Sequence, residues 1–269
     1  MYTTSNKTET MPEHVEKTPA AVHHDHVDAR FRHPFTCIVA GPTQSGKSTW
    51  VHNLLLHSDR LIDTPFDYVL IFVGAPTKSD KDGRQQMAPP ADKYPNMEVQ
   101  TFDLNAFYEN TSTLKSDFPE QLKTELERRA QKHQQGCVVF DDLMREMADC
   151  NVLFDMFTKY CSHYNVSCIF ISQNLFHTGS NKSVNTTLFR NTHIFVIFKC
   201  PLDNIPLRTI ATRMGQPQAP FMAMIKHIQD KYRYVVIRGD QRTPPGLTFT
   251  SDIFAQHPYP HMRCFELVQ

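Results

Sequence analysis

Apolar runs separated by amphipathic stretches recur along most of this 269-residue chain. A short apolar run bounded by turn residues is typical of a strand buried on both faces, and apolar residues at helical spacing predict a helix. The runs predict strands near 35–40, 67–73, 98–102, 137–140, 167–171, 193–198 and 232–237. The helical patterns lie near 47–57, 119–134, 145–163, 204–214 and 218–230. This alternation predicts an α/β fold in which helices flank a mostly parallel sheet.

The beginning of the chain lacks this pattern. Residues 1–33 are polar and rich in Thr, Glu, Lys and His, a composition that buries too little apolar surface to fold by itself. We therefore expect a disordered tail over 1–33 and one P-loop ATPase domain over 34–269. Two polar stretches inside the domain, Gly74–Asn96 and Phe176–Asn185, are expected to be loops at the carboxyl ends of strands.

The first predicted strand leads into a loop whose residue types suit phosphate binding. The loop reads GPTQSGKST and fits G-x-x-x-x-G-K-[ST], the Walker A motif or P-loop, between a strand and a helix as that motif requires. Its glycines permit a tight turn that presents backbone N–H groups to phosphate, and the helix N-terminus adds its positive dipole end. Lys47 is expected to reach the β- and γ-phosphates, and Ser48 to hold Mg²⁺. The expected nucleotide-binding residues are Gly41, Pro42, Thr43, Gln44, Ser45, Gly46, Lys47, Ser48 and Thr49.

Two later strands end in polar residues that complete such a site. The stretch GCVVFDDL ends a buried strand with two carboxylates, as in a Walker B motif, and ligands bind at the carboxyl ends of strands in open α/β sheets. Asp141 is expected to coordinate Mg²⁺, and Asp142 to polarise the attacking water or accept its proton. The next buried-strand pattern, SCIFISQN, ends in Gln173, which is placed to orient that water or to sense the γ-phosphate.

Composition limits the classes of partner and compartment. Lys plus Arg and Asp plus Glu both number 28, so the chain carries no overall basic field, although a local basic lining remains open. The seven cysteines form no C-x-x-C pair, which indicates a reducing compartment without a disulfide framework or a zinc module. No apolar run reaches membrane-spanning length and no signal-peptide core is present, so we expect an intracellular protein without a membrane partner.

The ordered motifs resemble those of the FtsK–HerA class of P-loop motor ATPases. More narrowly, they resemble the genome-packaging ATPases of double-stranded DNA viruses, in the branch found in Polinton-like and adintovirus-like elements. The segments that carry the resemblance are GPTQSGKST (41–49), VVFDDL (138–143), FTKYCSHYNVSCIFISQNLF (157–176) and NTHIFVIFKCPLDN (191–204). The resemblance covers about 34–256 in order and implies a RecA/FtsK–HerA-like fold.

The resemblance also implies a function and partners. It implies a homo-oligomeric ring that hydrolyses ATP with Mg²⁺ and translocates double-stranded DNA into a preformed viral capsid, next to capsid or portal vertex proteins. The expected location is the host nucleus, the viral assembly site or the virion. Lys159 stands where the family carries a basic residue proposed to act across the subunit interface. Because Leu202 replaces the arginine of the family's Pro-Arg-Asp, Arg190 is an alternative for that role.

Other functions use a P-loop as well. A small-molecule or nucleic-acid kinase has one, but it needs an acceptor pocket and usually lid arginines, and the sequence contains no Arg-rich lid. Another nucleic-acid-dependent NTPase, such as a helicase-like enzyme, is a further alternative. A scaffold with a relict P-loop is disfavoured because Lys47, Ser48, Asp141 and Asp142 are all present.

Overall fold

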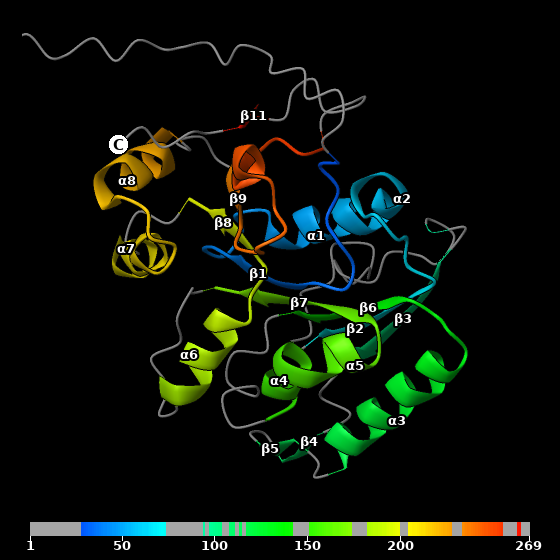
Figure 1. Ribbon diagram of the computed structural model, residues 1–269. Helices are drawn as coiled ribbons and strands as arrows, with labels where there is room; N and C mark the ends of the chain where they lie inside the picture. Colours follow the sequence, from blue (N-terminus) through cyan, green and yellow to red (C-terminus); the bar gives the residue numbers. More distant parts are fainter. Residues whose placement is uncertain are drawn as a thin grey trace, which may run out of the picture.

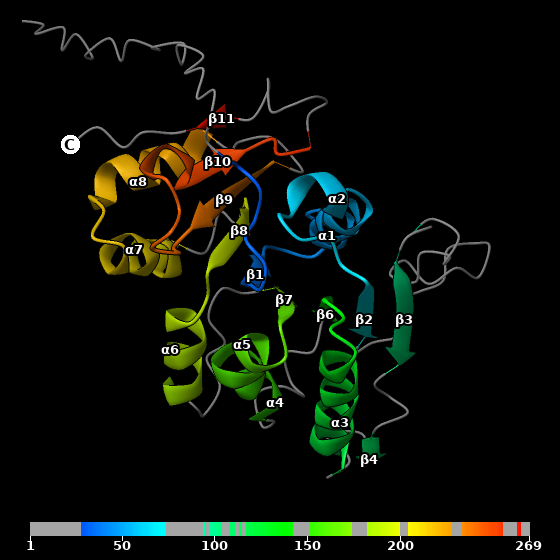
Figure 2. The same cartoon turned by 45° about the vertical axis from the view of Figure 1, so that its right-hand side comes forward.

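A nine-stranded sheet forms the centre of the part of the chain that the computed structural model describes. That part comprises residues 28–73, 94, 97–103, 108–110, 113–114, 117–141, 151–173, 182–199, 204–227, 233–254 and 263–264. The strand order is β11-β10-β9-β8-β1-β7-β6-β2-β3 (Figure 2). The strands of this sheet are β1 Thr36–Ala40, β2 Tyr68–Val73, β3 Glu98–Asp103, β6 Gly136–Asp141, β7 Val166–Ser172, β8 Ile194–Phe198, β9 Tyr234–Arg238, β10 Phe249–Ser251 and β11 Arg263–Cys264. A separate pair consists of β4 Tyr108–Asn110 and β5 Thr113–Leu114.

The sheet is mixed but mostly parallel. All neighbours from β8 through β1, β7, β6 and β2 to β3 pair in parallel, whereas β9, β10 and β11 pair antiparallel. Every residue of β1, β2, β6, β8 and β9 is buried, which explains why these strands are apolar almost throughout. The predicted α/β class and its mostly parallel sheet are therefore confirmed.

Helices cover both faces of the sheet. The helices are α1 Lys47–Leu56, α2 Ser58–Leu61, α3 Phe118–Gln131, α4 Asn151–Asp155, a π-helical segment Met156–Tyr160, α5 Cys161–His163, α6 Lys182–Arg190, α7 Asn204–Arg213, α8 Gln218–His227 and a short 3₁₀ turn Pro245–Leu247. Helices α1 and α2 pack on one face of the sheet. Helices α3 to α8 pack on the opposite face, where they form the larger of the two apolar clusters (Figures 1 and 2). No helix among the described residues is both long and apolar enough to cross a bilayer.

The start of the domain differs from the prediction. Residues 28–33, which the sequence assigns to the tail, lie against the domain: Phe31 is buried and forms a parallel bridge with Ile62. The buried Arg238 guanidinium donates to the Ala29 carbonyl at 2.8 Å and lies 4.4 Å from the centre of the Phe31 ring. These contacts supply the partners that a short polar segment lacks on its own. Residues 1–27 lie outside the described residues.

The predicted loop Phe176–Asn185 is wrong at its end, because Lys182–Asn185 form the first half of α6. The buried side chains of Leu188 and Phe189 anchor this helix to the core. Residues 174–181 lie outside the described residues, as do 74–93 and 95–96 of the first predicted loop and 145–150 of the third predicted helix.

Candidate nucleotide-binding site

The predicted phosphate loop joins the central strand β1 to α1. Gly41 follows β1 directly, and its N–H donates to the Ser172 carbonyl of the neighbouring β7 at 3.2 Å. A Cβ at Gly41 would lie 2.6 Å from the Phe198 Cβ, so the packing admits only glycine there. Gly46 precedes α1 with φ 100°, a conformation that side chains disfavour. Gly41 is therefore required by its packing against β8, and Gly46 by its own backbone conformation.

The interior of the loop is polar and suits an anion. Lys47 is buried, and its Nζ donates to the carbonyls of Gly41 and Pro42, each at 2.8 Å. The Ser45 hydroxyl is buried and has no hydrogen-bond partner among the described residues. The first turn of α1 adds N–H groups that have no partner within the helix. A phosphate group fits these donors, because a buried hydroxyl and an ammonium held by neutral carbonyls both gain from a negative charge.

A hydroxyl and a carboxylate meet beside the loop. Ser48 in the first turn of α1 places its Oγ 3.5 Å from Oδ2 of Asp141, the last residue of β6. The Asp141 side chain is buried. Such oxygens are ligands that Mg²⁺ accepts, usually together with water and phosphate oxygens. Within the described residues no group of three or more His, Cys, Asp and Glu side chains could hold a metal by itself.

Sheet topology brings the third predicted element to the same edge. The β7 strand lies between β1 and β6, with Ala40 paired to Ser172 and Asp141 paired to Ile171. Gln173, which follows Ser172, is therefore at the carboxyl edge between the loop and Asp141, and it is exposed. Asp142, the predicted catalytic carboxylate, lies outside the described residues.

The two candidate interface cations lie away from this site within the chain. Lys159 is in the π-helical segment on the sheet face opposite α1, largely exposed, with its Nζ 2.9 Å from Oδ1 of Asp155 (Figure 1). Arg190 is exposed at the end of α6. The next carbonyl, of Asn191, accepts from the Thr36 hydroxyl at the start of β1, which is the end of that strand remote from the loop. Neither cation therefore reaches the phosphate loop of its own subunit.

A group of aromatic side chains beside the loop was not predicted. It surrounds Trp50, which lies in the first turn of α1, and we refer to it as the aromatic cluster. Its members are Trp50, Phe198, Tyr234 and Phe254. They come from four segments that are far apart in the sequence or in different elements, namely α1, β8, β9 and the turn after β10, so no local pattern could have identified them.

Comparison with known proteins gives one match over most of the chain. The sequence profile of the poxvirus A32 protein family matches residues 23–242. A search of the curated proteins finds no significant match.

Solved structures show more distant similarity. The genome packaging NTPase B204 from Sulfolobus turreted icosahedral virus 2, in complex with ATP-gammaS, is 11% identical with a TM-score of 0.48, over 81% of this chain and 96% of that chain. The B204 DNA-packaging ATPase from Sulfolobus turreted icosahedral virus is 10% identical with a TM-score of 0.47, over 88% of this chain and 100% of that chain. EssC, ATPases 2 and 3, from Geobacillus thermodenitrificans is 14% identical with a TM-score of 0.47, over 77% of this chain and 38% of that chain.

Proposed function

Because the chain belongs to the poxvirus A32 protein family, a family of viral genome-packaging ATPases, we propose that it hydrolyses ATP to drive double-stranded DNA into a preformed capsid. The enzyme class predicted from the sequence, an ATPase, is confirmed by the family. The observation that carries the proposal is the meeting of the phosphate loop, Asp141 and Gln173 at one edge of the sheet. These groups come from three strands that lie side by side in space but are far apart in the sequence.

The loop would bind the triphosphate of ATP. In the structure the Lys47 ammonium is satisfied by two carbonyls of its own loop, and both bonds are available for exchange against phosphate oxygens. An ammonium and backbone N–H groups fixed around the transferred phosphate stabilise the charge that spreads over its oxygens in the transition state. The unpartnered Ser45 hydroxyl is one further donor inside the loop.

Ser48 and Asp141 would hold Mg²⁺. When bound, the ion neutralises charge on the β- and γ-phosphate oxygens. The 3.5 Å between the Ser48 and Asp141 oxygens makes at most a weak hydrogen bond, so this contact between them costs little to exchange for the ion.

The attacking water would be activated by the residues that directly follow β6 and β7, Asp142 and Gln173. Asp142 directly follows Asp141, and we assign it the proton from the attacking water or the orientation of that water. Gln173 at the end of β7 is exposed at the same edge and can hold the water through its amide. A cation from a neighbouring subunit, Lys159 or Arg190, would complete the site in a homo-oligomeric ring.

The partners follow from packaging. Double-stranded DNA would be gripped through its phosphates, since a translocase must move over any sequence. Capsid or portal vertex proteins would hold the ring, at the viral assembly site of the host cell or in its nucleus, or in the virion. A P-loop kinase or a helicase-like NTPase is the alternative, and the experiment below separates them.

The test is ATP hydrolysis by the full chain with and without duplex DNA, in a series of salt concentrations. We expect duplex DNA of any sequence to increase turnover, and the stimulation to fall steeply as salt rises, because binding through phosphates releases counterions. A kinase would instead transfer phosphate to an acceptor. A helicase-like enzyme would separate the strands of a labelled duplex. Either of those results, or indifference to DNA, would contradict the proposal.

A further inference from the structure

The aromatic cluster contacts the first turn of the phosphate-loop helix α1 through Trp50. Trp50 lies one turn into α1, with its ring centre 6.0 Å from that of Tyr234 and 5.7 Å from that of Phe254. Phe198 lies 5.6 Å from Tyr234 and is the side chain against which Gly41 packs. The cluster therefore touches the loop at both of its ends, at Gly41 and at the start of α1.

Strand direction brings the last member of the cluster to this place. The β10 strand runs antiparallel to β9, and β9 runs antiparallel to β8, so β10 ends at the same edge as β1. The chain then turns at Asp252, whose φ of 54° is rare for a residue with a side chain. Ile253 is buried, and its N–H donates to the Tyr234 hydroxyl at 3.1 Å. Phe254 is thereby fixed on Trp50 and Tyr234.

Phe254 differs from the other three rings in its exposure. Trp50, Phe198 and Tyr234 are buried, whereas Phe254 is only partly buried. One partly exposed aromatic ring, packed against the two buried rings of Trp50 and Tyr234, thus lies next to a loop built for phosphates. Aromatic rings in such positions stack with the flat faces of nucleobases.

We infer that Phe254 is the platform on which the base of the bound nucleotide stacks. The inference rests on the proposed nucleotide site. It adds that this site prefers a nucleotide to a triphosphate that carries no base. Tyr234 acts as a positioning residue, because its hydroxyl holds the backbone of Ile253. Burial keeps the pKa of the Tyr234 phenol well above its usual range, so this hydroxyl remains protonated and neutral under assay conditions.

Phe254→Leu tests the platform because leucine keeps an apolar side chain but has no aromatic face. We expect KM for ATP to rise roughly tenfold and kcat to change less than about twofold, since one stacked base is lost. Inhibition by tripolyphosphate, which has no base, should not change. Phe254→Trp should restore the KM of the wild type. The matched control is Phe102→Leu, which should leave KM unchanged. Phe102 is a partly buried ring on the far strand β3, and its centre lies 5.0 Å from that of Phe72.

Three results would overturn the inference. One is a Phe254→Leu protein that is less stable but has the KM of the wild type, because Phe254 would then only pack. Another is an equal loss of affinity for ATP and for tripolyphosphate, because the effect would then pass through the phosphate loop. Should Phe254→Leu not fold, calorimetry on the wild type decides: ribose 5′-triphosphate should bind roughly tenfold more weakly than ATP, and equal affinity refutes the platform. Calorimetry reports on the platform even without turnover, so failure of the proposed ATPase motor remains distinguishable.

Discussion

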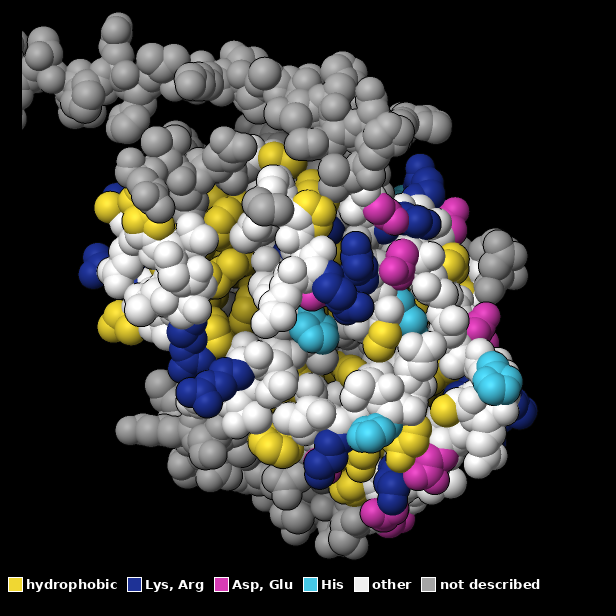
Figure 3. Space-filling model, viewed as in Figure 1, with side chains coloured by type: hydrophobic (Ala, Val, Ile, Leu, Met, Phe, Trp, Pro, Cys, Tyr) yellow, Lys and Arg dark blue, Asp and Glu magenta, His cyan; other side chains and the backbone are white. Residues whose placement is uncertain are grey.

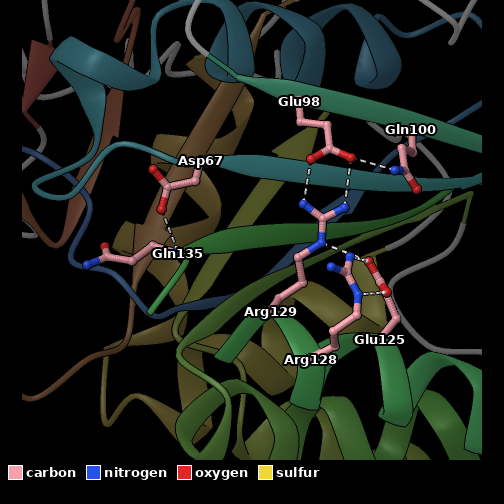
Figure 4. Close-up of polar contacts among 7 residues, drawn as sticks. All are labelled: Asp67, Glu98, Gln100, Glu125, Arg128, Arg129 and Gln135. Carbon is pink, nitrogen blue, oxygen red and sulfur yellow. Dashed lines mark hydrogen bonds and ion pairs between the residues drawn. The ribbon is translucent and has the colours of Figure 1, made fainter. Parts of the chain in front are cut away.

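The guanidinium of Arg129 binds the carboxylate of Glu98 through two hydrogen bonds, of 2.6 and 2.8 Å, and so joins α3 to the edge strand β3 (Figure 4). Arg129 also donates from Nε to Glu125 at 2.7 Å and lies 4.6 Å from the centre of the Tyr68 ring. Its own side chain is 2% exposed, although both carboxylates reach solvent. A fixed bidentate fork of this kind supplies orientation as well as attraction.

Arg129→Ala should destabilise the fold, because it removes a buried cation and leaves two carboxylates close together. We expect the free energy of unfolding to fall by about 3 kcal/mol, in the range for breaking a buried ion pair. Urea unfolding measures it. Arg128→Ala is the matched control: Arg128 is the next residue of α3 and also binds Glu125, but it is 45% exposed, and its removal should leave stability near that of the wild type. Equal losses in the two variants would show that the burial of Arg129 contributes nothing.

The same network predicts a loss of stability in acid. Hydrogen bonds from Arg128, and then from Arg129, lower the pKa of Glu125 from 4.5 to about 2, and the Arg129 fork lowers the pKa of Glu98. A folded-state pKa below the unfolded one stabilises the fold above the unfolded value and ceases to do so as pH falls through the folded value. Urea unfolding should therefore show stability that declines from about pH 4.5 toward pH 2. In Glu125→Gln this decline should be shallower, and an unchanged pH dependence would exclude Glu125 as its source.

Lys47→Ala should reduce kcat for ATP by at least about a hundredfold, because the point charge on the transferred phosphate is lost. Phosphate release measures the rate. The fold should survive with a loss of roughly 1 kcal/mol, since the bonds from Lys47 to the Gly41 and Pro42 carbonyls disappear. Lys132→Ala, at an exposed position after α3, is the control. Turnover of the Lys47 variant near the rate of the wild type would contradict the phosphate-loop assignment.

Asp141→Asn and Asp142→Asn should separate metal binding from chemistry. With Asp141 neutral, the oxygen beside Ser48 loses its charge, and we expect Mg²⁺-dependent ATP binding to weaken roughly 10- to 100-fold. With Asp142 neutral, ATP should still bind but hydrolysis should stop, because only the group that handles the water is changed. Equilibrium binding and phosphate release on both proteins give the answer. If Asp141→Asn stops hydrolysis without weakening ATP binding and Asp142→Asn weakens Mg²⁺-dependent binding, the roles of the two residues are the reverse of those proposed.

The sequence predicts well what is decided locally. All of the predicted strands are present within two residues of their expected bounds, because strands buried on both faces must be apolar throughout. The phosphate loop depends on contiguous residues, and the positive φ of Gly46 is a need that the motif itself makes visible, whereas the close packing of Gly41 on Phe198 is not. Even the meeting of Ser48 with Asp141 follows from the rule that ligands bind at the carboxyl ends of parallel strands.

Features decided by packing between distant segments were not predictable. The α6 helix begins in Ser-, Asn- and Thr-rich sequence with weak helix propensity, and burial of Leu188 and Phe189 outweighs that preference. Residues 28–33 are polar overall, yet they are bound to the domain by Arg238, which lies more than 200 residues further along the chain. The aromatic cluster likewise depends on the strand order, which no single segment encodes.

The final prediction concerns the cation that a neighbouring subunit would supply. A P-loop domain is a slow ATPase until a positive charge reaches the transition state, and neither Lys159 nor Arg190 can reach the loop of its own chain. Lys159 is the first choice because it is exposed on a helix that returns from β6, the strand of the Asp pair, to β7. Its ion pair with Asp155 raises its pKa, so it stays charged throughout the range of an ATPase assay.

Mixing two inactive proteins tests this role. Lys159→Ala subunits keep the phosphate loop, and Lys47→Ala subunits keep the cation, so in a mixed ring some interfaces contain both intact groups. We expect partial ATPase activity to return on mixing, although each protein alone is inactive. Asp155→Ala, which removes the partner of Lys159 but not its charge, is the control and should remain active. Co-assembly is verified by pull-down of differently tagged subunits. If activity does not return in confirmed mixed assemblies, or if Lys159→Ala alone is fully active, Lys159 is not the trans-acting group, and the same mixing with Arg190→Ala decides whether Arg190 is.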